Sequence, residues 1–274
     1  MPSALPLKVR RLFGATAYAI DGAEFSFDRL TRTAAAYAAP AGGEKPSVAA
    51  WSPEMRLSVV TDAWAFIDHV NRLRKLLQRF DYDGATPARV QQFLDATEPA
   101  RQIRNRLQHL DEDIYTGAFS EEGHPVLGTV TWIDARDHPL QRRYAVASGP
   151  SIDAGKMIEF EVNELPAGAI GHFQLMASDK RVDLDGLLDE LRDFVPAFEQ
   201  MTERSIGESI RTAATERSIE PEALCGSGIT DMTMLATFVP TGPGAFTLQD
   251  DGMHGVVEVP PHAYRLPEKE SVPT

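Results

Sequence analysis

The sequence predicts an α+β protein that is mainly helical. Apolar residues recur at helical spacing through residues 1–116 and again over residues 182–217, whereas residues 117–181 hold short β-like runs between turns rich in Gly, Pro and Asp. We therefore predict an up-and-down helical bundle from residues 1–116 and 182–217, with a small antiparallel β insertion at 117–181. Residues 218–274 are predicted to form an irregular, acidic tail rich in Pro and Gly.

Two long helices are expected first. One covers residues 6–39, where apolar side chains recur about every 3.5 positions until Pro40 ends the pattern. The other covers residues 53–80, with Ser52 as its N-cap and Pro53 in the first helical position. Its apolar face is the clearest in the chain and consists of Val59, Ala63, Phe66, Val70, Leu73, Leu77 and Phe80.

A third helical stretch opens at Thr86-Pro87 and is interrupted by Pro99, which lacks the N–H that a helix interior needs. Beyond Pro99, apolar side chains lie at i, i+4, i+7 and i+11, at Ile103, Leu107, Leu110 and Ile114. This part of the stretch is therefore expected to pack against the bundle by one face and to turn its polar residues elsewhere.

The rest of the chain alternates between strand-like and helical patterns. The β-like runs are Val126 to Ile133, Arg143 to Ala147, Ile158 to Val162 and Ala169 to Ala177. A last helix, capped by Asp183 or Asp185, is expected to continue to about residue 217. In the tail, two strand segments around Asp250-Asp251-Gly252 are expected to form a hairpin.

The net charge of −13 is unevenly distributed along the chain. Residues 1–116 carry 15 Lys and Arg against 14 Asp and Glu, whereas residues 117–274 carry 12 against 26. The acidity therefore does not exclude a nucleic-acid partner for the first half. A single cysteine, Cys225, cannot form an internal disulfide, and no apolar run reaches the roughly 20 residues of a membrane span. We expect a cytoplasmic protein without a membrane partner.

The stretch after Pro99 carries the most informative residues, Arg104, Asn105 and His109. On a regular helix Asn105 and His109 share a face, whereas Arg104 lies about 140° away from His109 around the axis. Arg104 and His109 would therefore reach one phosphate only through a distorted helix end or a partner subunit.

At these positions the sequence resembles the HEPN superfamily, whose signature is an Arg, a polar residue that is often Asn, and a His after four to six intervening positions. The order of helices is also similar, with two long helices before the motif and one after it. The β insertion looks like that of certain abortive-infection-type and uncharacterised bacterial members.

The resemblance implies a metal-independent endoribonuclease that acts as a homodimer, such as a toxin or phage-defence component, with no cofactor. His109 would be the general acid or base, Arg104 would stabilise the charge on the phosphorane, and Asn105 would orient one of them. The ribose 2′-hydroxyl would be the nucleophile, so the implied substrate is RNA. An antitoxin or other inhibitor protein is a further implied partner.

Weaker candidates accompany this motif. Arg101 and the basic stripe Arg72, Lys75 and Arg79 are candidates for RNA binding, and Asp62, Asp68 and His69 are candidates for supporting the motif. Two alternatives remain open. The protein could be a non-catalytic HEPN-like module that binds RNA or another protein, or the polar residues could belong to a solvated helix face on which Arg and His are incidental.

Other patterns favour ordinary structure. The glycine-rich stretch from Gly149 to Lys156 lacks the spacing and the following helix of a phosphate loop. Asp134, Asp137 and His138 are predicted to form a solvated turn in place of a metal site. The three tryptophans, Trp51, Trp64 and Trp132, are expected in the core or at an interface.

Overall fold

The computed structural model describes residues 5–37, 52–82, 84–109, 115, 127–136, 141–147, 165–177, 180–221, 237–242 and 245–249. The chain forms two compact units. The larger is Pro2–Gly226, and the smaller consists of Ser227–Thr274 together with Met1. The larger unit holds the described helices and a four-stranded antiparallel sheet. The prediction of a mainly helical α+β chain with a small antiparallel sheet is therefore confirmed.

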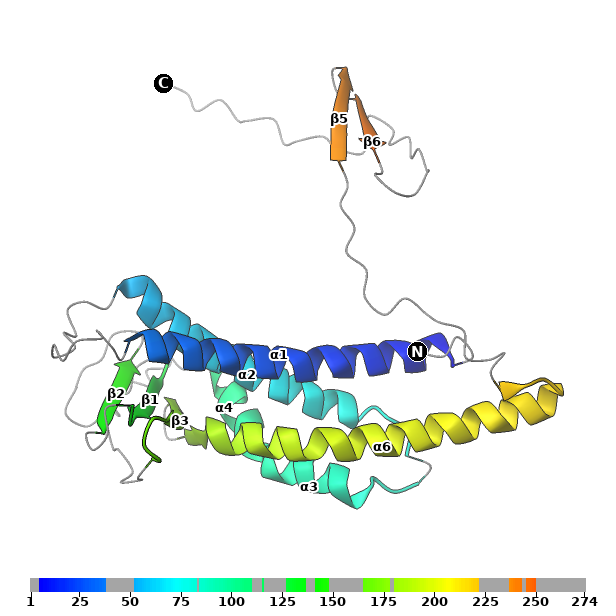
Figure 1. Ribbon diagram of the computed structural model, residues 1–274, viewed down its shortest axis with the longest axis horizontal. Helices are drawn as coiled ribbons and strands as arrows, with labels where there is room; N and C mark the ends of the chain where they lie inside the picture. The colour runs from blue at the N-terminus through cyan, green and yellow to red at the C-terminus, as the bar shows by residue number, and fades with distance from the viewer. Residues whose placement is uncertain are drawn as a thin grey trace. The chain divides into compact units, whose positions relative to one another are not determined.

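The two long helices are α1 (Leu7–Tyr37) and α2 (Pro53–Leu77), which lie side by side (Figure 1). The backbone N–H of Met55 donates to the hydroxyl of Ser52 at 3.2 Å, so Ser52 caps α2 as predicted. The helices are in close contact at Gly22, where an added Cβ would lie 2.3 Å from the His69 ring. Gly22 is thus required for its size and not for its backbone conformation.

The predicted interruption near Pro99 is present. It separates α3 (Ala88–Ala96) from α4 (Glu98–Gln108), with Thr97 between them. The expected continuation of α4 is wrong at its end, because the helix stops at Gln108. His109 is the C-cap, and its backbone N–H donates to the carbonyl of Arg106 at 3.2 Å in a tightened last turn. Leu110 and Ile114, the predicted end of the apolar stripe, lie outside the described residues.

The sheet consists of β1 (Thr129–Asp134), β2 (Arg142–Ala147), β3 (Ile170–Ala177) and β4 (Lys180–Asp183), in the order β2-β1-β3-β4. Strand β4 was not predicted, and the predicted run at 158–162 lies outside the described residues. Opposite Trp132, the pairing of β1 with β3 is irregular, and His172 there has a φ of 53°. This is a β-bulge on β3.

The last long helix, α6 (Leu184–Arg217), begins at Asp183, whose side chain accepts the Gly186 N–H at 3.1 Å. Of the two predicted caps, Asp183 is therefore the one used. Pro196 lies inside α6, flanked by Phe194 and Phe198. Phe194 stacks on Phe93 of α3 at 4.2 Å, which ties α3 to α6 (Figure 1).

Helices and sheet share one hydrophobic core. Phe27 of α1 makes edge contacts with Phe66 of α2 at 5.3 Å and with Phe173 of β3 at 5.6 Å. The fully buried Trp132 of β1 stacks on Tyr144 of β2 at 5.2 Å. The β insertion is therefore packed into the bundle and is not an appendage to it.

The smaller unit contains a hairpin of β5 (Thr237–Gly242) and β6 (Ala245–Gln249). A hairpin in the tail was predicted, but its turn was predicted at Asp250-Asp251-Gly252. Residues 250–252 lie outside the described residues, and the described hairpin, in which only residues 243–244 separate the two strands, is a different one. In the part of the chain that the structure describes, no helix combines the length and apolar character needed to cross a membrane.

Candidate functional site

Helix α4 holds Arg104 against Asp68 of α2. The Arg104 Nε lies 3.0 Å from Asp68 Oδ1, and Arg72, one turn further along α2, places Nη2 3.0 Å from Asp68 Oδ2. Arg104 is the more enclosed of the two arginines, with 22% of its side chain exposed against 52% for Arg72. Of the residues expected to support the motif, Asp68 is the one in contact with it.

The charge state of Asp68 follows from these contacts. Partial burial acts to raise the pKa of Asp68, but the hydrogen bonds and charges of Arg104 and Arg72 outweigh it, so the pKa lies below its ordinary value. Asp68 is therefore ionised at neutral pH, and it fixes the direction of the Arg104 guanidinium. The Nη1 atom of Arg104 is buried and has no hydrogen-bond partner.

A groove of about 460 Å³ lies beside Arg104, and we call it the Trp64 groove. Four of its residues lie on α2 and three lie on α4: Thr61, Trp64, Ala65, Asp68, Arg104, Leu107 and Gln108. On each helix the lining residues are spaced at i, i+3 and i+4, and on α2 Asp68 adds a position one turn further on. Residues with this spacing share one face of a helix, so the groove lies where one face of α2 meets one face of α4. The indole N–H of Trp64 donates to the carbonyl of Leu127 at 2.9 Å.

The other two motif residues are placed differently. Asn105 is half-buried on α4, and His109 is exposed directly after the helix. Neither is among the residues that line the Trp64 groove. Within one subunit the structure therefore joins Arg104 to Asp68, and it does not join Arg104 to His109 around a common cavity.

The predicted RNA-binding residues are spread over the surface. Arg101 is paired with Glu98 on its own helix, and Arg72 is paired with Asp68. Lys75 is exposed further along α2, and Arg79 is exposed two residues beyond the end of that helix. Only Arg72 is linked through Asp68 to the motif.

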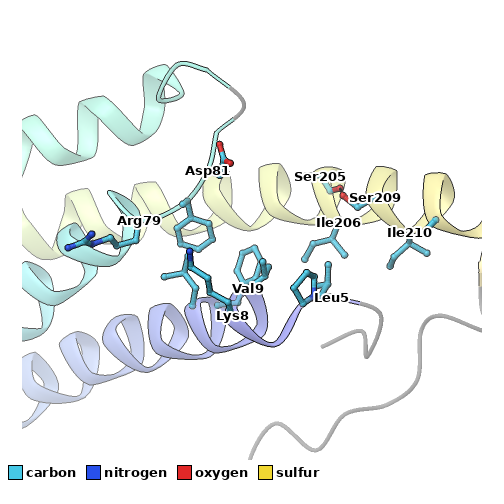
Figure 2. A pocket seen from close by; sticks show the side chains of 14 residues that line it. Leu5, Lys8, Val9, Arg79, Asp81, Ser205, Ile206, Ser209 and Ile210 are labelled. Carbon is cyan, nitrogen blue, oxygen red and sulfur yellow. Dashed lines mark hydrogen bonds between the residues drawn. The ribbon is translucent and has the colours of Figure 1, made fainter.

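Arg79 instead lines a second cavity of about 480 Å³, between the start of α1, the end of α2 and the second half of α6. Leu5 and Val9 point toward α6 there, and Ile206 and Ile210 point toward α1 (Figure 2). None of the three motif residues lines this cavity. Its walls are largely apolar, and Lys8, Arg79 and Asp81 are the charged residues among those that line it.

Sequence reasoning missed Arg74, which is the best-connected arginine of α2. It donates to the carbonyl of Leu94, to the Thr97 hydroxyl at 2.6 Å and to the Glu98 carboxylate at 2.7 Å. These groups lie around the interruption between α3 and α4, and the Leu94 carbonyl is among the last carbonyls of α3, which have no partner within their own helix. The signal available in the sequence was an arginine on the apolar face, next to Leu73.

Other titratable residues have structural surroundings. Asp62 is buried and pairs with Arg29 at 3.0 Å, and its burial raises its pKa despite that partner. Burial lowers the pKa of His69, aided by the charge of Arg72 and opposed by that of Asp68.

The predicted solvated turn of Asp134, Asp137 and His138 is wrong for Asp134, which ends β1, is buried and pairs with Arg136. Asp137 and His138 lie outside the described residues. Throughout the described segments, no group of three His, Cys, Asp or Glu side chains could hold a metal ion. Comparison with protein families, curated proteins and solved structures finds none that matches this chain.

Proposed function

We propose that the protein is a metal-independent HEPN-like endoribonuclease that acts as a homodimer. The observation that carries the proposal is the Asp68–Arg104 pair, because an arginine held in a fixed direction beside a groove is suited to bind a phosphate. His109, exposed at the end of the same helix, is the proton-transfer group. Asn105 orients the His109 ring or the phosphate.

The dimer follows from the separation of the two catalytic groups. Since Arg104 faces the Trp64 groove and His109 follows the helix end, each active site uses Arg104 of one subunit and His109 of the other. A two-fold axis beside α4 would create two such sites. Light scattering at micromolar concentration should accordingly give twice the 30.1 kDa mass of the chain.

The decisive experiment is RNA cleavage by purified variants. His109→Ala should lower the cleavage rate by about 100-fold or more, the usual cost of losing a general acid or base. Thermal stability should not change, since His109 is exposed. Arg104→Ala should cause a similar loss, and Arg104→Lys should recover only part of it, because lysine lacks the planar fork.

Controls separate this chemistry from general electrostatics. Arg32→Ala removes one exposed positive charge from an i, i+4 pair on α1 and should leave cleavage unchanged. EDTA should have no effect. Cleavage that persists in His109→Ala, or that EDTA abolishes, would contradict the mechanism.

A non-catalytic HEPN-like module that binds RNA or another protein is the second candidate. The observation that favours it is the ion pair itself, because Asp68 offsets the charge of Arg104 in the free protein. Binding of RNA or of a partner protein such as an antitoxin, without cleavage by either wild type or variants, would support this candidate.

A further inference from the structure

The Trp64 groove has walls of unusual composition for a helix–helix junction. Trp64 and Ala65 form its apolar α2 side and Leu107 its apolar α4 side, while Gln108 and Arg104 bring an amide and a guanidinium. A ligand that fits such a groove has apolar faces and polar atoms at its edges.

Trp64 lines the groove with its only hydrogen-bond donor already in use. Its indole N–H is already bonded to the Leu127 carbonyl, which fixes the ring and removes its single donor. Unlike the fully buried Trp132, Trp64 remains partly exposed within the groove. A fixed, partly exposed indole without a spare donor is suited to stacking.

The groove also offers polar groups to a ligand. Arg104 lines it, although Nε is bonded to Asp68 and the buried Nη1 is out of a ligand's reach. Gln108 is exposed at the end of α4 and adds both a donor and an acceptor. Nucleobases combine two flat faces with ring nitrogens or carbonyl oxygens at the edge, and this combination matches the groove.

We propose that the Trp64 groove binds a nucleobase of RNA, stacked on Trp64 and contacted at its edge by Gln108. The base belongs to the nucleotide whose phosphate Arg104 binds, so this inference rests on the proposed function. It adds a base-binding site next to the phosphate site, and with it a source of sequence preference.

The test compares two probes that share a backbone. One is a fluorescein-labelled 2′-O-methyl decaribonucleotide, which resists attack through the 2′-oxygen, and the other is the abasic chain of equal length. The full-length wild type should bind the base-containing chain about 5- to 150-fold more tightly, the range for one stacked base. In Trp64→Leu this difference should disappear, while binding of the abasic chain stays constant.

Two further variants guard against a folding defect in Trp64→Leu. Ala65→Leu fills the groove without changing charge or removing the Trp64–Leu127 hydrogen bond, and it should produce the same loss. Phe25→Leu is the matched control, since Phe25 is an exposed aromatic residue on α1, with 58% exposure, and does not line the groove. It should bind both probes as the wild type does.

The outcomes distinguish this proposal from the nuclease proposal. Equal binding of the two probes by the wild type would overturn the base site whatever cleavage shows. Conversion of a dimer to a monomer by Ala65→Leu would overturn it as well, because the groove would then be a subunit contact. Base-dependent binding that Trp64→Leu and Ala65→Leu abolish, in a protein that cleaves no RNA, would support the base site and refute the nuclease.

Discussion

Arg74 shows how a single buried side chain can complete a helix interruption. Only 5% of its side chain is exposed, and it contacts three groups around Thr97. Arg74→Met keeps the aliphatic stem but leaves these groups without their donor, so we expect a loss of about 3 kcal/mol in unfolding free energy. Urea denaturation measures it. Arg79→Met, at an exposed position two residues beyond α2, should stay within about 0.5 kcal/mol. Equal effects of both changes would contradict this role.

Asp185 is predicted to make stability depend on pH. Its carboxylate accepts the Phe173 N–H at 2.5 Å beside the bulge. Burial raises the pKa of Asp185 to about 6, with Phe173 and His172 opposing this and Asp183 and Asp189 adding to it. A folded-state pKa above the unfolded value favours the protonated form. The contribution of protonated Asp185 to the free energy of unfolding is therefore complete below about pH 4, and it is lost as the pH rises through about 6.

Asp185→Asn removes this titration and keeps an oxygen that can accept from Phe173. The melting temperature of the variant, relative to wild type, should rise between pH 4 and pH 7. Asp193→Asn, an exposed change on the same helix at a residue that does not act on the pKa of Asp185, provides the control. A difference between Asp185→Asn and wild type that does not vary with pH would refute the assignment.

At the scale of elements, the two glycines of α1 should respond in opposite ways to alanine. Gly22→Ala would force a Cβ into the His69 ring, and we expect a loss of about 1–3 kcal/mol from overpacking. Gly14→Ala meets nothing within 4 Å and should gain about 0.5–1 kcal/mol from helix propensity. Denaturant unfolding of the two variants measures the pair. Stabilisation by Gly22→Ala would mean that α1 and α2 are further apart than described.

Local signals predicted the elements that local chemistry determines. Ser52-Pro53 predicted the start of α2, and Pro99 predicted the break before α4. The end of α4 at Gln108 and the short strand β4 were not predicted, although β4 pairs with β3, from which only two residues separate it. The pairing of β5 with β6 was not predicted, although the sequence Pro243-Gly244 between them is a strong turn signal.

In the candidate site, the residues were identified from the sequence, but the contacts between them were not. Arg104 and its neighbour Asp68 were both identified from residue type and helical spacing, but the contact between them required the fold. The Trp64 groove could not be predicted, because Trp64 and Leu107 are 43 positions apart in the sequence and meet only where α2 and α4 pack.

For the whole molecule, the acidic C-terminal unit should limit RNA binding. Ser227–Thr274 carries six acidic and two basic side chains, and like charge repels phosphate. A chain ending at Gly226 should therefore bind RNA more tightly than the full chain, and the difference should shrink as salt shortens the Debye length below about 10 Å. Anisotropy titrations at two salt concentrations measure this. Replacing the six acidic side chains by amides should reproduce the effect, and an unchanged affinity at low salt would exclude it.

The two ion pairs between α2 and α4 also specify how the helices are aligned along their length. Arg74 pairs with Glu98 and Asp68 pairs with Arg104, so the two pairs are six positions apart on each helix. Helix α2 supplies the positive charge in the first pair and the negative charge in the second. Sliding α4 by about one turn would bring Arg101 opposite Arg74 and set two positive charges together. The charge order thus disfavours a slipped register, in the way that alternating charges select partners in coiled coils. The same order keeps Arg104 at one fixed height beside Trp64.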